Sequence, residues 1–80
     1  MKAKEMFEEL DYKCEEYDDF IIYKDIRNNL VKYEIVFNKY ERCAELIPTC
    51  NGEVHYFVRL DRDLHKAINQ QCKELGWLDD

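Results

Sequence analysis

The chain is poor in the residues that interrupt regular structure or build phosphate-binding loops. Only two of its 80 residues are glycine and one is proline, a composition typical of a folded domain and not of a linker or a disordered segment. Gly52 and Gly76 each stand alone, so the sequence has no glycine-rich phosphate loop. No apolar run approaches the roughly 20 residues that span a bilayer, and the charges near the N-terminus do not fit a secretory leader. We therefore expect a cytoplasmic protein folded as a single domain over residues 1–80.

Cysteine and histidine are present, but they lack the spacing of metal ligands. Zinc sites usually use two closely spaced ligand pairs, whereas the four cysteines and two histidines include no CxxC or HxxxH. We expect free thiols in a reducing compartment, with a disulfide or a metal site as the alternatives. The cysteines are Cys14, Cys43, Cys50 and Cys72.

The sequence also lacks a recognisable catalytic arrangement. Cys50 and His55 are the best nucleophile and base available, but no strained turn or oxyanion loop accompanies them. Acidic pairs at 15–16 and 18–19 lie in a polar segment that offers nothing to shift a pKa. The prediction is no enzyme, no metal and no cofactor, and an enzyme using Cys50 and His55 is kept as an alternative.

Positive charge is scarce as well, and the negative charge is unevenly placed. The formal net charge is −6. Residues 1–19 carry eight acids against three lysines, a net of −5, whereas the rest of the chain carries ten acids against nine bases. Direct binding to a nucleic acid backbone needs clustered Lys and Arg and is therefore disfavoured. A partner with a basic surface is favoured instead.

Hydrophobic periodicity predicts one helix at each end of the chain. Over residues 2–10 the apolar positions follow one helical face. A second helix begins at Asp61 or Asp63 as N-cap and continues to about residue 75. Its predicted apolar face is Leu64, Ile68, Cys72 and Leu75, flanked by Ala67 and Gln71.

The sequence pattern in the middle of the chain predicts β-strands. Strands are predicted at 20–24, 31–37, 40–47 and 53–60, the second with clear period-2 alternation. Residues 11–19 are predicted to be an ordered connector. The expected fold class is α+β, in the order α-β-β-β-(β)-α, with an antiparallel sheet and the N- and C-terminal helices packed on one face.

Two similar phrases, EELDY at 8–12 and KELGW at 73–77, predict how these helices end. Each places a small or acidic residue before an aromatic. We expect Gly76 in the left-handed conformation, and Tyr12 and Trp77 packed back onto the last helical turns. For Asp11 the same conformation is left open, because aspartate adopts it less readily than glycine.

The remaining candidate site is a surface. Acidic residues with two interspersed tyrosines form either a solvated face that confers solubility or a surface that docks onto an Arg/Lys-rich groove. The tyrosines support docking, because tyrosine is enriched in interface hot spots. The predicted partner-binding residues are Tyr12, Glu15, Glu16, Tyr17, Asp18 and Asp19.

Three stretches carry a family signature: AKEMFEELDY from Ala3 to Tyr12, YEIVF from Tyr33 to Phe37, and LHKAINQQCKELGW from Leu64 to Trp77. Together they resemble small uncharacterised proteins encoded in phages and prophages of Firmicutes, with the pattern K-E-M-F-E-E-L-G-Y … L-x-K-A-I-x-x-Q-x-x-E-L-G-W. This chain departs from that pattern at Asp11, where the relatives have glycine, and in its cysteines, which the pattern lacks. The resemblance implies a phage-encoded protein in a bacterial host cell and no particular activity.

These observations predict a small acidic, non-enzymatic interaction protein that binds and modulates a host protein, either as an anti-defence inhibitor or as a nucleic-acid mimic. No membrane partner and no direct nucleic acid contact are expected. The alternative is a module that binds a ligand or forms a homodimer through an exposed aromatic sheet face or edge. The residues considered for that face are Tyr23, Tyr40, Tyr56 and Phe57.

Overall fold

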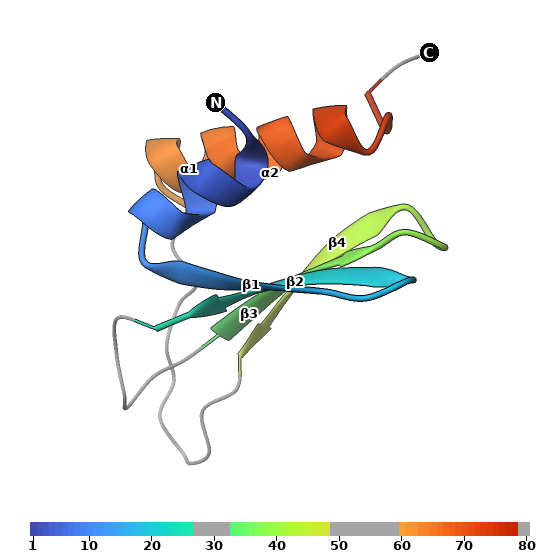
Figure 1. Cartoon of the computed structure of the whole chain (residues 1–80), viewed down its shortest axis with the longest axis horizontal. Helices are drawn as coiled ribbons and strands as arrows, with labels where there is room; N and C mark the ends of the chain where they lie inside the picture. The colour runs from blue at the N-terminus through green and yellow to red at the C-terminus, as the bar shows by residue number, and fades with distance from the viewer. Residues whose placement is uncertain (27–32, 49–59, 79–80) are drawn as a thin grey trace.

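The structure, a computed structural model, describes residues 1–26, 33–48 and 60–78. Their elements follow the chain as α1 (Ala3–Glu9), β1 (Tyr12–Glu16), β2 (Phe20–Asp25), β3 (Tyr33–Asn38), β4 (Cys43–Pro48) and α2 (Arg62–Glu74). The strands form one antiparallel sheet in the order β1-β2-β3-β4, and the two helices lie side by side over one of its faces (Figure 1). The predicted α+β fold, with both terminal helices on one face, is confirmed.

The two helices begin and end at the signals present in the sequence. The carboxylate of Asp61 accepts a 2.9 Å hydrogen bond from the Leu64 amide, so Asp61 is the N-cap of α2. Gly76 (φ 76°) is left-handed, as predicted, and Asp11 (φ 66°), for which the sequence left this conformation open, is left-handed too. The ring of Tyr12 packs edge-on against Phe7, with 5.7 Å between centroids, and Trp77 lies 6.1 Å from the ring of Phe37.

The prediction of a connector over residues 11–19 is wrong, because Tyr12–Glu16 forms β1. The strand alternates: Tyr12 is buried and Cys14 half-buried toward the helices, whereas Lys13 and Glu15 point to the opposite face. Period-2 alternation was therefore present, but acidic residues in and around the strand obscured it. The strand predicted at 40–47 begins later, at Cys43, because residues 39–42 form the turn between β3 and β4.

The strand predicted at 53–60 lies outside the described residues apart from Leu60, which is not in a strand. Along the described chain, no helix is long and apolar enough to cross a membrane.

The core lies between the sheet and the two helices. Phe7 of α1 stacks on Tyr23 of β2, with 3.8 Å between ring centroids, and both side chains are buried. The buried cluster consists of Phe7, Tyr12, Ile21, Tyr23, Ile35, Phe37, Leu64 and Ala67. The opposite side of the sheet, which we call the open face, is not covered by either helix (Figure 1).

The buried stripe of α2 differs from the predicted one. Leu64, Ala67 and Gln71 are buried, whereas Ile68 and Cys72 are half-buried. The stripe is rotated because Gln71 faces the core, where its Oε1 accepts a 2.6 Å hydrogen bond from the Tyr23 hydroxyl. A hydrogen-bonded polar side chain can occupy a buried position that periodicity assigns to an apolar one.

Candidate functional site

The turn between β1 and β2 presents three of the predicted partner-binding residues. The Tyr17 amide donates a 2.8 Å hydrogen bond to the Phe20 carbonyl, so Tyr17–Phe20 forms a tight turn with Asp18 and Asp19 in its centre. Both aspartates are exposed, and Tyr17 is 52% exposed. Aspartate suits these central positions, because its side chain tolerates turn conformations.

The other three predicted residues have different surroundings. Tyr12 is only 2% exposed and belongs to the core, which removes its side chain from any contact surface. Glu15 lies on the open face, where its carboxylate is 3.2 Å from Lys24 Nζ. Hydrogen bonds from Lys24 and then from Tyr17 lower the pKa of Glu15. Glu16 is exposed and lies 3.8 Å from Lys39 Nζ.

The contact of Glu16 with Lys39 reflects a feature that sequence reasoning missed. The β3–β4 turn lies against the β1–β2 turn, because the Lys39 amide donates a 2.8 Å hydrogen bond to the Asp19 carbonyl. Figure 1 shows both turns at the same end of the sheet. Asn38 shapes the second turn, since its side-chain oxygen accepts hydrogen bonds from the amides of Tyr40 and Glu41 at 3.0 and 2.9 Å.

Together the two turns form one acidic surface, which we call the acidic tip. It comprises Glu16, Tyr17, Asp18, Asp19, Lys39, Tyr40, Glu41, Arg42 and Glu45. Five carboxylates face two cations there, and Tyr40 is 88% exposed. Glu41, Glu45 and Tyr40 lie more than 20 residues from Asp18 in the sequence, so only the strand register brings them together.

The negative charge of the acidic tip is only partly neutralised within the chain. Lys39 Nζ lies near Glu16 and donates a 3.2 Å hydrogen bond to the Tyr17 carbonyl. Within the described ranges, the carboxylates of Asp18 and Asp19 have no cation at ion-pair distance. These two carboxylates are therefore available to an external cation.

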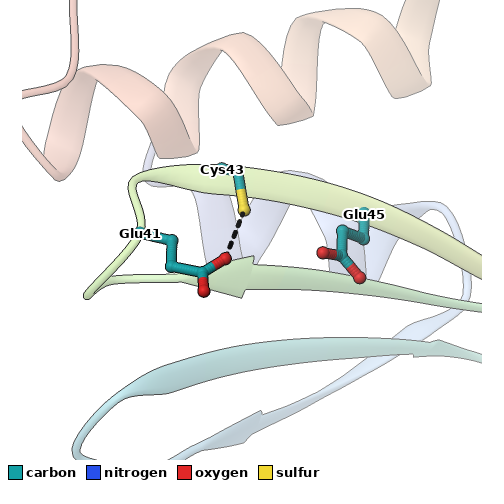
Figure 2. Close-up of side chains that lie close together, drawn as sticks. All are labelled: Glu41, Cys43 and Glu45. Atoms are coloured by element: carbon teal, nitrogen blue, oxygen red, sulfur yellow. Dashed lines mark hydrogen bonds between the residues drawn. The ribbon is translucent and has the colours of Figure 1, made fainter.

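Glu41, Cys43 and Glu45 form a compact group of possible metal ligands at this surface (Figure 2). One ligand atom from each lies within 4.8 Å of the other two, and Cys43 Sγ is 3.9 Å from a Glu41 carboxylate oxygen. Desolvation, and then the charges of Glu45 and Glu41, raise the pKa of the Cys43 thiol. Metal binding by cysteine requires the thiolate, so this environment works against Cys43 as a ligand.

The catalytic alternatives receive no geometric support from the described residues. Cys50 and His55 lie outside the described ranges. Cys14, Cys43 and Cys72 are free thiols and half-buried. Cys14 and Tyr23 both line a cavity of about 120 Å³. Burial raises the pKa of Cys14 despite a hydrogen bond with Tyr23, which disfavours the nucleophilic thiolate.

Two of the four residues considered for an aromatic sheet face do not lie on an exposed face of the sheet. Tyr23 is 2% exposed and faces the helices, and Tyr40 lies in the β3–β4 turn. Tyr56 and Phe57 lie outside the described residues.

A scan against protein-family models gave no match, and neither did searches of curated proteins and of solved structures.

Proposed function

We propose that this chain is a small, non-enzymatic interaction protein that binds a basic protein surface of a bacterial host through its acidic tip. The observation that supports this is the meeting of two exposed turns, which places five carboxylates beside two cations on one end of the sheet. Such a local excess of charge accelerates encounter with a complementary surface and aligns the partners.

The exposed tyrosines support a protein partner over a simple counter-ion. Tyr17 directly precedes the two aspartates, Tyr40 lies in the neighbouring β3–β4 turn, and their side chains are 52% and 88% exposed. Tyrosine contributes a large apolar area together with a polar hydroxyl, and it is enriched among residues that dominate binding energy. A groove that normally receives nucleic acid has the required Arg and Lys side chains. The sharpest form of the proposal is therefore a phage-encoded inhibitor or nucleic-acid mimic that competes for such a groove.

The experiment is a pull-down from bacterial lysate using the immobilised chain. The test variant is Asp18→Lys/Asp19→Lys, and the matched control is Glu8→Lys/Glu9→Lys on α1, which changes the net charge equally at exposed positions. We expect a nucleic-acid-binding protein to be captured by the wild type and the control, to be lost with the test variant, and to be displaced by duplex DNA. Capture that is equal with all three proteins would refute the role of the acidic tip.

A further inference from the structure

The acidic tip carries two tyrosine side chains that are accessible to a partner. Tyr17 is 52% exposed and Tyr40 is 88% exposed, and they lie in the two neighbouring turns. The face of a tyrosine ring carries partial negative charge, so it attracts a cation that lies over it. The tip therefore presents two kinds of group that bind cations, namely carboxylates and aromatic faces.

The side chain of Tyr17 is held in place at both of its ends. Its hydroxyl donates a 3.0 Å hydrogen bond to the Glu15 carboxylate, and this bond raises the pKa of Tyr17, so the ring stays neutral at physiological pH. At the backbone, the Tyr17 carbonyl accepts a 3.2 Å hydrogen bond from Lys39 Nζ. A ring that is already positioned loses little further conformational freedom when a partner packs against it.

Tyr40 is positioned through the backbone of its turn. The Tyr40 amide donates a 3.0 Å hydrogen bond to Asn38 Oδ1, and the Glu41 amide donates a 2.9 Å hydrogen bond to the same oxygen. The backbone that carries the ring is thus fixed, while the ring itself remains accessible to a partner.

The carboxylates of the tip add the second kind of contact. Asp18 and Asp19 directly follow Tyr17, and within the described ranges no cation lies at ion-pair distance from either of them. The planar guanidinium of arginine can donate two parallel hydrogen bonds to a carboxylate, and it can also stack on an aromatic face. The ammonium of lysine lacks this planar fork, and its strong hydration opposes close contact with a ring.

From this combination of exposed rings and carboxylates we infer that the acidic tip binds arginine side chains in preference to lysine side chains, so that the surface it recognises is rich in arginine. The inference rests on the proposed function and names the chemistry of its partner. Charge attraction alone would not distinguish arginine from lysine, because both side chains carry a single positive charge.

The test compares two peptide probes of equal charge, octa-arginine and octa-lysine, each acetylated, amidated and labelled with the same fluorophore. Their binding to the full chain is measured by fluorescence anisotropy in 0.15 M salt, where charge attraction is screened beyond about 8 Å. We expect the wild type to bind octa-arginine about tenfold more tightly than octa-lysine, since stacking on each of the two rings contributes a factor of roughly three.

Two double variants separate the rings from the charge. Tyr17→Leu/Tyr40→Leu removes both rings and keeps the net charge, so it should weaken octa-arginine binding about tenfold and leave octa-lysine binding within about twofold. The matched control is Tyr17→Phe/Tyr40→Phe, which loses the same hydroxyls, including the donor to Glu15, but keeps the rings. This control should retain the preference for octa-arginine. Both positions are exposed, and circular dichroism verifies that the variants are folded.

The outcomes distinguish this inference from the proposed function. Equal affinity of the wild type for the two peptides would overturn the inference and leave the proposed function standing, and so would a preference that the leucine variant retains. If neither peptide bound the wild type, both the inference and the acidic tip as a surface for basic partners would be refuted.

Discussion

Two residues in the left-handed conformation end the two helices, and they differ in how well they suit that conformation. Asp11 has φ 66° and carries a side chain, whereas Gly76 has φ 76° and carries none. Left-handed backbone costs a non-glycine residue roughly 1 kcal/mol, less for aspartate than for most. The ends of both helices could be predicted from the sequence, because the signal is local: an aromatic follows a small or acidic residue at the end of an amphipathic segment. The left-handed conformation could be predicted for Gly76 but not for Asp11, because aspartate also favours other conformations.

Exchanging these residue types should change stability in opposite directions. We expect Asp11→Gly to raise the free energy of unfolding by about 0.5–1 kcal/mol, because it relieves backbone strain. Gly76→Ala should lower it by about 1 kcal/mol through strain alone, since a Cβ at this position would meet no atom within 4 Å. Urea denaturation of the two variants measures both effects. No gain from Asp11→Gly would mean that its carboxylate stabilises the turn as much as its conformation costs.

Tyr23 is the residue whose ionisation should make stability depend on pH. Burial, and then the neighbouring Cys14, raise the pKa of Tyr23 above its usual value. The unfolded chain loses this proton near pH 10, whereas the folded chain keeps it, so the stabilisation is complete below pH about 10 and declines as pH rises above it.

Tyr23→Phe should therefore lower stability at pH 7 by about 1–3 kcal/mol, because the buried Gln71 carbonyl oxygen loses its donor. The difference between wild type and variant should shrink above pH 10. Melting curves from pH 7 to 11 measure this, with the exposed Tyr40→Phe as control. A difference that is constant across this range would contradict the assigned role of Tyr23 ionisation.

At the level of elements, the sequence predicted those strands that have one clearly apolar face, and it missed the strand in which charged residues dominate. The alternation in β3, with Ile35 and Phe37 buried, is clear in the sequence. In β1 the inward positions hold Tyr12, Cys14 and Glu16, a weaker contrast with Lys13 and Glu15. The structure identifies β1 as a strand because it pairs with β2. This pairing depends on residues outside β1, so the composition of residues 12–16 alone does not predict it.

The buried stripe of α2 shows the same limit. Its helical period and its N-cap could be read from the sequence, but the centre of its buried face could not. Gln71 is buried because Tyr23, 48 residues away in the chain, donates a hydrogen bond to it. Hydrophobic periodicity assigns polar residues to the solvent-exposed side of a helix. It therefore misses two polar side chains that are buried in the core because they form a hydrogen bond with each other.

For the whole molecule, the sequence predicted one of the two turns that form the acidic tip and missed the other. The aspartates of the β1–β2 turn are adjacent in the sequence, and their cluster was recognised there. Glu41 and Glu45 join them only because β2 and β3 pair in a register that sets Phe20 opposite Asn38. A register is fixed by a whole sheet, and it cannot be read from a single strand.

Binding of a partner at the acidic tip should depend strongly on salt. The interaction is between exposed charges, and the distance over which such charges act falls from about 10 Å at 0.1 M to about 3 Å at 1 M ionic strength. We expect a captured partner to elute from the immobilised chain as NaCl is raised through this range. Elution that needs detergent or urea instead of salt would indicate an apolar contact, and would contradict the electrostatic role of the tip.

The hydrogen bond from the Ala3 amide to the Glu74 carboxylate, at 2.7 Å, spans 71 positions of the chain. The strands, by contrast, each pair with their neighbour in sequence. On a ribosome the described strands are therefore made before α2, and α1 has no α2 to pack beside until residues 62–74 have been made. Until then the rings of Phe7 and Phe37 lack the cover that α2 and Trp77 give them. Pairing of the strands with their sequence neighbours is thus possible before the core between sheet and helices can close.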